Sequence, residues 1–325
     1  MSSTQRKLPI SQYISNASQL IYGGMNLGGG WKSNPITKDD EKLTQQLLET
    51  CLENGINILD LADIYTFGKA EEVVGRVLKK SPDLLDELVI QSKLGLKLTP
   101  VHPVKQYDFS AQWVSKALDD ILSRLGMAKL DVLFLHRPDP LMDVKELADT
   151  LNKAYDDDKF GYLAVSNMHA GQLAYIQSNV TMPIIANQLE MSLLKADFIE
   201  DGITVNMQEN CSQGFPRGTL EFCAQQNIQL QSWGSMAQGQ FNDIHHDDAN
   251  IAATSKLVAE LAEKYQVTPN AIVLAWLMRH PANIQPVVGT LKPERIIEIA
   301  QSTKITLERE EWFKLYETRR GQELP

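Results

Sequence analysis

The sequence predicts an α/β protein of the (β/α)8 TIM barrel class with extra helices, formed as a single domain over residues 1–325. Short apolar runs rich in β-branched residues alternate with longer segments in which apolar residues recur at helical spacing. That alternation is typical of a parallel sheet covered by helices. Neither a linker nor an internal repeat interrupts it. Barrels of this class occupy about 250 residues, so 325 residues leave room for added helices and loops.

The expected strands are short stretches dominated by Ile, Val, Leu and Phe, as residues buried on both faces of a parallel sheet should be. Several of these stretches stop at a polar residue. In chain order the expected strands are Gln19–Gly23, Ile56–Leu61, Leu88–Lys93, Asp131–His136, Tyr162–Ser166, Ile184–Leu189, Ile228–Trp233 and Gln285–Val288.

The expected helices each carry one apolar stripe. In the first, Leu43 and Leu47 belong to the stripe, Asp39 favours the positive N-terminal end, and Asn54 lies where the helix should stop. Two helices follow the seventh strand and two follow the eighth, which accounts for the extra helices. The expected ranges are Asp39–Asn54, Lys69–Lys80, Ser110–Leu125, Val144–Asp157, Ala170–Gln177, Gly218–Asn227, Ala249–Tyr265, Pro269–Arg279, Glu294–Gln301 and Glu308–Arg319.

A doubly wound nucleotide-binding sheet is the alternative α/β architecture. Its fingerprint is a G-x-G-x-x-G turn after the first strand, and the glycines at positions 23, 24 and 28–30 do not have that spacing. The sequence also lacks a G-x-x-x-x-G-K-[ST] phosphate loop. A nucleotide that binds this chain must therefore be held by a different arrangement.

Charge and cysteine usage exclude several classes of function. A formal charge of −10 argues against nucleic acid as a partner, although it permits one basic pocket for a single phosphate. Cys51, Cys211 and Cys223 are widely separated and are expected to be reduced thiols, not a disulfide or zinc site. With no long apolar run, the chain is expected to be cytoplasmic and not membrane-bound, with residues 1–8 poorly ordered.

Polar residues end three consecutive strands and are the first candidates for chemistry. Asp60, Lys93 and His136 close the second, third and fourth expected strands. Active sites of βα barrels lie at these strand ends, so the three side chains should converge on one rim. Each residue alone is more often a structural group, and the combination is what indicates a site.

Longer motifs around these positions resemble those of the aldo-keto reductase superfamily, in the same order and over nearly the whole chain from Leu20 to Ala300. They are residues 57–65 (NILDLADIY), 91–93 (QSK), 133–139 (LFLHRPD), 165–167 (VSN), 187–190 (NQLE) and 288–295 (VGTLKPER).

The resemblance implies a catalytic group of Asp60, Tyr65, Lys93 and His136, with Tyr65 as proton donor to a carbonyl. Negative charge builds on the carbonyl oxygen as hydride arrives at carbon, so an acid must stand close to that oxygen. A phenol with a pKa of about 10 is a reluctant acid, and a lysine ammonium beside it would stabilise the phenolate. Asp60 would keep the lysine charged, and a neutral His136 would orient the substrate oxygen.

The resemblance also implies NADPH as cofactor. Amide and hydroxyl side chains would hold the carboxamide, and Trp233 would stack on the nicotinamide. Lys292 with Arg295, at a helix start, would bind the 2′-phosphate and so favour NADPH over NADH. The implied contacts are Gly24, Met25, Asp60, Ser166, Asn167, Gln188, Trp233, Gly234, Ser235, Met236, Gly239, Gly289, Thr290, Lys292, Arg295 and Glu298.

The expected substrate is a small carbonyl compound in contact with Tyr65, His136 and Trp31, which follows a glycine run that is equally typical of a flexible turn. The mechanism needs no metal, and the stretch His245–Asp248 is interpreted as a solvated loop. Two alternatives remain: a cofactor-binding redox sensor or regulatory subunit with little turnover, and an aldolase in which Lys93 forms a Schiff base.

Overall fold

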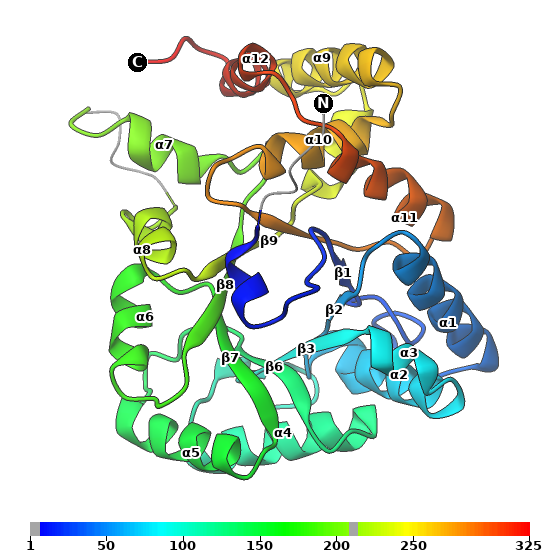
Figure 1. Cartoon of the computed structure of the whole chain (residues 1–325), viewed down its shortest axis with the longest axis vertical. Coiled ribbons are helices and arrows are strands. Elements are labelled where there is room, and N and C mark those ends of the chain that lie inside the picture. Colours follow the sequence, from blue (N-terminus) through cyan, green and yellow to red (C-terminus); the bar gives the residue numbers. More distant parts are fainter. Residues whose placement is uncertain (1–6, 208–213) are drawn as a thin grey trace.

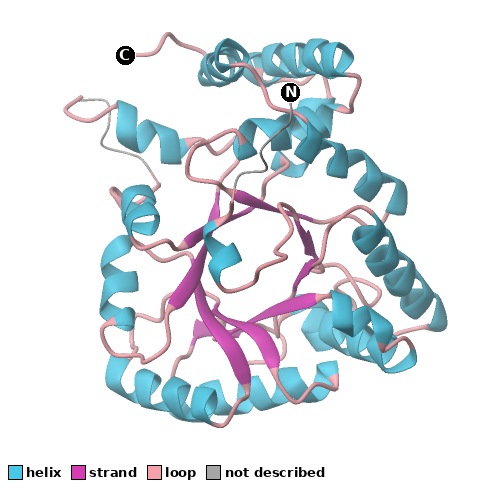
Figure 2. Cartoon of the chain, viewed as in Figure 1, coloured by secondary structure: helices cyan, strands magenta, loops and turns pink. Residues whose placement is uncertain are grey.

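Eight parallel strands close into a barrel in the order β1-β10-β9-β8-β7-β6-β3-β2 in the computed structural model, which describes residues 7–207 and 214–325 (Figures 1 and 2). This confirms the predicted fold class. The barrel strands are β1 (Ile21–Gly23), β2 (Ile58–Asp60), β3 (Val89–Leu94), β6 (Leu130–Leu135), β7 (Phe160–Ser166), β8 (Ile184–Glu190), β9 (Gln229–Trp233) and β10 (Gln285–Val288).

Helices surround the barrel on its outer side, as Figure 2 shows. They are α1 (Lys38–Glu53), α2 (Lys69–Lys80), α3 (Asp83–Glu87), α4 (Ala111–Leu125), α5 (Val144–Asp156), α6 (Ala170–Gln177), α7 (Asp197–Ile203), α8 (Thr219–Gln225), α9 (Ala249–Tyr265), α10 (Pro269–Met278), α11 (Pro293–Ala300) and α12 (Arg309–Arg320). Short 3-10 helices are η1 (Pro9–Gln12), η2 (Tyr65–Gly68), η4 (Ala237–Asn242) and η5 (Gln301–Lys304).

Helix ends form where the sequence supplies capping groups. Helix α1 begins after Thr37, whose hydroxyl accepts from the backbone N–H of Asp40 while the Asp40 carboxylate accepts from the backbone N–H of Thr37. Helix α4 begins after Ser110, which accepts from the N–H of Trp113, and ends at Gly126 in the left-handed conformation. These caps fix where each helix starts against the barrel.

Apolar helix stripes pack on the outer face of the barrel. Val73 and Val77 of α2, and Val114, Leu118 and Ile121 of α4, are fully or almost fully buried. Burying one such side chain stabilises the fold by about 1.5–3 kcal/mol relative to exposure. The described cysteines Cys51 and Cys223 are free and buried in the same core, and Cys211 lies outside the described residues.

Several elements were not expected from the sequence. A two-stranded antiparallel hairpin of β4 (Leu96–Lys97) and β5 (Gln106–Tyr107) follows β3, and α3 and α7 are short helices of five and seven residues. Such pieces are too short to show a helical or strand period in the sequence. Residues 1–6 of the N-terminal segment lie outside the described residues.

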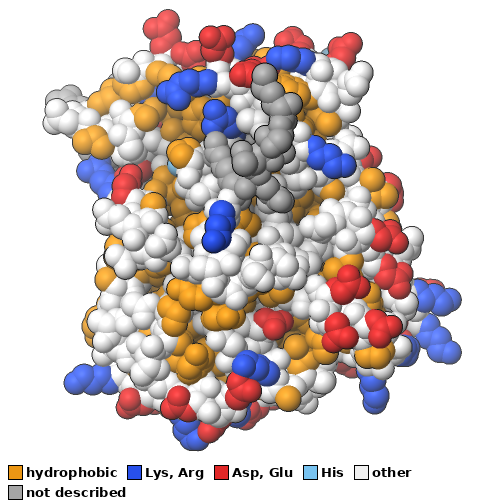
Figure 3. All heavy atoms as spheres, viewed as in Figure 1, with side chains coloured by type: hydrophobic (Ala, Val, Ile, Leu, Met, Phe, Trp, Pro, Cys, Tyr) orange, Lys and Arg blue, Asp and Glu red, His pale blue; other side chains and the backbone are white. Residues whose placement is uncertain are grey.

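The N-terminal segment, in its described part from residue 7 onward, covers one mouth of the barrel, where Figure 1 shows its dark blue ribbon in front of the strands. Leu8, Ile10 and Ile14 are buried there against the barrel residues Val132 and Phe134. On the face seen in Figure 3, basic and acidic side chains are interspersed around the rim. None of the helices in the described ranges is long and apolar enough to cross a membrane.

Helices α2 and α4 approach each other most closely at Gly75, and we predict that a methyl group there destabilises the fold. A Cβ at Gly75 would lie 2.2 Å from the carbonyl oxygen of Arg124. We expect Gly75→Ala to lower the free energy of unfolding by about 1–3 kcal/mol, measured by urea titration, because backbone must move.

The control is Gly202→Ala, since Gly202 also lies in a helix but has no atom within 4 Å of the added Cβ. We expect it to leave stability unchanged or raise it by less than about 1 kcal/mol. Equal losses in both variants would contradict the close-packing argument.

Candidate active site

Lys93 is fully buried at the carboxyl end of β3, and each hydrogen of its ammonium has an acceptor. Nζ lies 2.6 Å from Asp60 Oδ1, 2.9 Å from the Leu61 carbonyl oxygen and 3.4 Å from Tyr65 Oη. Burial alone would lower the pKa of Lys93, but the charges of Asp60 and Tyr65 and their hydrogen bonds to the ammonium together outweigh it, so the pKa is raised above its ordinary value. The lysine is therefore a charged ammonium.

Tyr65 lies five residues after the end of β2, at the start of the tight η2 turn. Thr66 and Phe67 both have positive φ, 49° and 61°, so the chain reverses sharply and the phenol is directed toward Lys93. Burial raises the pKa of Tyr65, and the positive charge of Lys93 opposes that rise. Within the described residues, the bond from Lys93 is the one hydrogen bond of the phenol oxygen, which leaves its proton available to a ligand.

His136 follows β6 and completes the cluster. Its backbone N–H donates to the Leu94 carbonyl oxygen at 2.9 Å, and its ring meets that of Tyr65 edge-on at 6.2 Å between centroids. Burial first, and then the charges of Lys93 and Arg137, hold the pKa of His136 well below its ordinary value. Nδ1 is buried without a hydrogen-bond partner in the described structure. The imidazole is therefore neutral and open to one more contact.

A second acidic cluster lies behind the turn that carries Tyr65. Glu71 of α2 is fully buried, accepts from Arg124 Nε at 2.6 Å, and also accepts from the Ser92 hydroxyl. Asp63 lies beside it, and burial and the charge of Glu71 hold its pKa well above the ordinary value. The turn is thereby linked through α2 to α4.

Three strand ends are joined by the amide of Asn167. Its Nδ2 donates to the His136 carbonyl oxygen at 3.2 Å and to Ser166 Oγ at 2.8 Å, and its Oδ1 accepts from Trp233 Nε1 at 3.1 Å. Asn167 has a φ of 60°, which asparagine tolerates better than most residues. The guanidinium of Arg137 lies 5.9 Å above the Trp233 ring. The expected residues Ser166, Asn167 and Trp233 therefore form one group.

The side-chain amide of Gln188 is directed into the barrel. Nε2 donates to Asp60 Oδ1 and to Gln231 Oε1, both at 3.0 Å. Gln91 and Gln231 belong to the same buried network, and the sequence reasoning did not single them out for a role. Polar residues at alternate positions of otherwise apolar strands are the signal that could have identified them.

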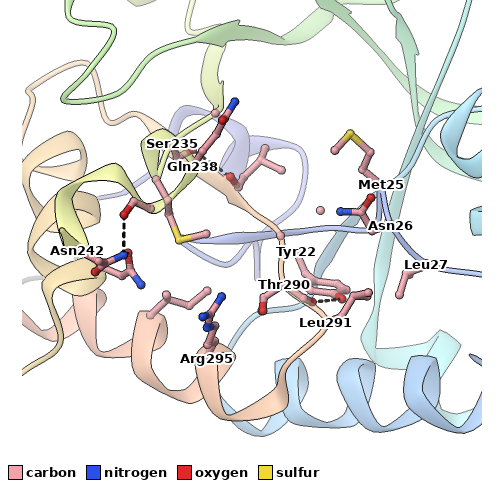
Figure 4. Close-up of a pocket in the computed structure, with 18 residues that line it drawn as sticks. Tyr22, Met25, Asn26, Leu27, Ser235, Gln238, Asn242, Thr290, Leu291 and Arg295 are labelled. Carbon is pink, nitrogen blue, oxygen red and sulfur yellow. Dashed lines mark hydrogen bonds between the residues drawn. The ribbon is translucent and has the colours of Figure 1, made fainter. Parts of the chain in front are cut away.

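A cleft of about 510 Å³ opens between the loops that follow β1, β9 and β10 (Figure 4). Ligand pockets in proteins typically have volumes of about 300–1,000 Å³. Lining residues that the sequence predicted are Met25, Gly234, Ser235, Met236, Gly239, Gly289, Thr290 and Arg295. Lining residues that it missed include Asn26, Leu27, Gln238, Asn242, Asn270 and Leu291.

Glycine and serine shape the wall of this cleft after β9. Gly234 and Gly239 have φ of 68° and 79°, a conformation that side chains disfavour. Ser235 is buried, and its hydroxyl donates to the Val287 carbonyl oxygen at 3.0 Å, which attaches the loop to β10. Tyr22 donates to the Thr290 carbonyl oxygen at 2.9 Å, drawn as a dashed line in Figure 4. The backbone is thus fixed and exposed to a ligand.

The far end of the cleft lies at the start of α11. Lys292 is the N-cap and Pro293 the first helical residue, and Arg295 in the first turn lines the cleft. Lys292 and Arg295 are exposed and form no salt bridge within the described residues. Gly24, Lys292 and Glu298 were also predicted contacts, but they are not among the residues that line this cleft.

Trp31 contacts the turn that carries Tyr65 through one aromatic pair. Its ring meets the ring of Phe67 edge-on at 5.4 Å, and Phe67 is two residues from Tyr65. Both rings are about two-fifths exposed, at 39%. The structure thus places Trp31 against Phe67, and the predicted substrate contact of Trp31 stays a prediction.

The chain is similar in sequence to known aldo/keto reductases. The family model of the aldo/keto reductase family matches residues 19–319. A 6-dehydroglucose reductase of Agrobacterium fabrum is 30% identical over 94% of this chain and 96% of its own length.

Solved structures share the fold. The glycerol dehydrogenase of Gluconobacter oxydans superposes with a TM-score of 0.78 at 22% identity, covering 95% of this chain and 93% of that one. An aldo-keto reductase from Klebsiella pneumoniae, solved in complex with NADPH, has a TM-score of 0.71 at 20% identity and covers 92% and 90%. With the family model matching nearly its whole length, the chain belongs to the aldo/keto reductase family of oxidoreductases.

Proposed function

We propose that this protein reduces an aldehyde or ketone to an alcohol with NADPH, and that Tyr65 donates the proton. The observation that carries the proposal is the convergence of a charged Lys93, a protonated Tyr65 and a neutral His136 at one end of the barrel. In the net reaction the carbonyl carbon gains a hydride and its oxygen gains a proton, so the site needs one acid.

The residues of the cleft fit a dinucleotide. Fixed backbone at Gly234 and Gly239 permits close approach of a pyrophosphate, and Arg295 with the N-terminus of α11 suits the 2′-phosphate of NADPH. Trp233 and Asn167, with Ser166, would hold the nicotinamide end. When bound, the nicotinamide supplies the hydride.

Tyr65 serves as the acid because Lys93 lies beside it and stabilises the phenolate that remains once the proton is transferred. In the buried site the phenol keeps its proton at neutral pH, since burial raises its pKa. After transfer to the substrate oxygen, the phenolate lies against the Lys93 ammonium, which stabilises it. Asp60 holds that ammonium charged throughout.

His136 would orient the carbonyl oxygen. A neutral imidazole offers one N–H donor, and the low pKa of His136 keeps it from competing with Tyr65 as an acid. Asn167 donates to the His136 carbonyl oxygen at 3.2 Å and accepts from Trp233, so it links the backbone of His136 to the Trp233 ring. A carbonyl between Tyr65 and His136 would therefore receive two hydrogen bonds.

A Schiff-base aldolase is disfavoured by the same geometry. Its lysine must be neutral to attack a carbonyl, whereas Lys93 has a raised pKa and makes an ion pair with Asp60. A sensor with little turnover would keep the cofactor cleft without needing the phenol of Tyr65. Measured turnover of carbonyl substrates therefore distinguishes a reductase from a sensor.

Removal of the phenol hydroxyl tests the acid. We expect Tyr65→Phe to lower kcat for carbonyl reduction by about 10²–10⁴-fold while NADPH affinity changes little, because the hydroxyl acts on the substrate oxygen. NADPH oxidation with a panel of aldehydes measures turnover, and fluorescence titration measures binding.

Tyr162→Phe is the control, since it removes a phenol hydroxyl that donates to the Tyr13 carbonyl oxygen, near the mouth that the N-terminal segment covers. It should retain normal turnover. Unchanged turnover in Tyr65→Phe would refute the acid role, and NADPH binding without wild-type turnover on any carbonyl would favour the sensor.

The shifted pKa values predict a flat pH profile for reduction. His136 stays neutral below its ordinary pKa of about 6.5, and Tyr65 stays protonated above the ordinary phenol value of about 10. The kcat for reduction should therefore be constant between these values and fall only as pH rises through the pKa of Tyr65. An inflection near 6.5 that disappears in His136→Gln would show that the imidazole titrates in this range.

Arg295 should select NADPH over NADH. We expect Arg295→Ala to weaken NADPH binding about tenfold, or about 1.4 kcal/mol, with little change for NADH, because only NADPH carries the 2′-phosphate. Lys256→Ala, at an exposed position of α9, removes the same charge away from the cleft and is the control. Equal losses for both cofactors would place Arg295 away from that phosphate.

A further inference from the structure

A chain of four buried glutamines crosses the barrel interior. Gln91 of β3, Gln188 of β8, Gln231 of β9 and Gln285 of β10 are each at most 2% exposed. Barrel interiors are usually filled by branched apolar side chains, and buried amides are unfavourable unless hydrogen-bonded. Four buried glutamines at one level of the barrel therefore indicate a specific structural or functional role.

The hydrogen bonds form a continuous chain from Asp60 to Ser18. Gln91 Nε2 donates to Asp60 Oδ1 at 2.5 Å and to Gln231 Oε1 at 2.9 Å. Gln231 Nε2 donates back to Gln91 Oε1 at 3.1 Å and to Gln285 Oε1 at 3.4 Å. Gln285 Nε2 donates to the Ser18 carbonyl oxygen at 2.5 Å. Each amide is thus held in one orientation by its neighbours.

The chain ends on the oxygen that holds Lys93. Asp60 Oδ1 accepts from Lys93 Nζ, Gln91 Nε2 and Gln188 Nε2, so a single carboxylate oxygen receives three hydrogen bonds. Gln231 braces both amide donors, because its Oε1 accepts from Gln91 and from Gln188. Loss of Gln231 would release both.

We propose that Gln91 and Gln231 are positioning residues of the reaction: they fix the Asp60 carboxylate so that Lys93 keeps one N–H directed at the Tyr65 oxygen. The inference rests on the proposed function, since it concerns the proton donor of that reaction. Within the described residues Gln231 makes no hydrogen bond to Lys93 or Tyr65, and it acts through Gln91, Gln188 and Asp60. An Asp60 that is free to rotate draws Lys93 away from Tyr65.

The effect of displacing Lys93 is best measured on the reverse reaction, alcohol oxidation, in which Tyr65 must first lose its proton. A displaced Lys93 stabilises the phenolate less, so the pKa of Tyr65 rises and activity develops at higher pH. The other titratable groups near Tyr65 are Asp60 on β2, Asp63 on its own turn and His136 after β6. A substitution at Gln231 replaces none of these groups and acts on them only through the position of Asp60.

The chain offers a matched pair of substitutions. Gln229 and Gln231 lie two residues apart on β9, and both are fully buried. The Gln229 amide donates to the carbonyl oxygens of Leu230 and Asn283, outside the network around Asp60. Gln231→Met and Gln229→Met therefore each remove one buried amide, but only the first reaches Asp60.

We expect Gln231→Met to lower kcat for alcohol oxidation by about ten- to a hundredfold, the scale of a small misplacement of a catalytic group. The alkaline inflection should move to higher pH, with KM for NADP⁺ unchanged. Gln91→Met should produce the same shift, and the double variant should be no worse than the poorer single one, since both act through Asp60. Gln229→Met should keep the wild-type profile.

A fall in kcat without a shift of the inflection, or the same effect in Gln229→Met, would overturn the inference and leave the glutamines as packing. If Gln231→Met does not fold, Gln231→Asn keeps an amide but shortens its reach, and the same shift is expected. A wild-type protein without turnover would overturn the proposed function along with this inference, whereas normal wild-type turnover with an unshifted Gln231→Met would overturn this inference alone.

Discussion

The ion pair between Lys93 and Asp60 is the interaction on which the rest of the site depends. Both side chains are almost completely buried, at 1% and 2% exposure, and burying such charges costs several kcal/mol for each ion. The cost is offset only because the ammonium has three acceptors and the carboxylate oxygen three donors. Strands β2, β3 and β8 supply these groups, so the barrel must close in this register for the charges to be tolerated.

Burial acts on the two uncharged members of the site in opposite directions. It raises the pKa of Tyr65 and lowers that of His136, so both are neutral near pH 7. Within the group of Asp60, Tyr65, Lys93 and His136, the charges are therefore those of the Lys93–Asp60 ion pair, behind the place where a ligand would react. Tyr65 can thus act as the acid while His136 stays a neutral hydrogen-bond donor. The apolar surroundings produce this difference as much as the residue types do.

The strands and their polar ends could be predicted from the sequence because both are local properties of the chain. Asp60, Lys93 and His136 end apolar runs, and the barrel topology brings such ends together without further information. The glutamine chain could not be found this way, because which faces of β3 and β9 meet across the barrel depends on register. Asn242 and Asn270 line the cleft from separate elements, and only the tertiary fold shows that they meet. The β4–β5 hairpin is likewise too short to leave a period in the sequence.

The N-terminal segment makes the two ends of the barrel unequal. Leu8, Ile10 and Ile14 fill one mouth with hydrocarbon, and the Ile10 N–H donates to Gln229 Oε1 at 3.5 Å just inside it. Solvent therefore approaches Lys93 from the opposite end, past Tyr65 and His136. A ligand seated at that end would cover Tyr65 and His136 and so lie between Lys93 and bulk water.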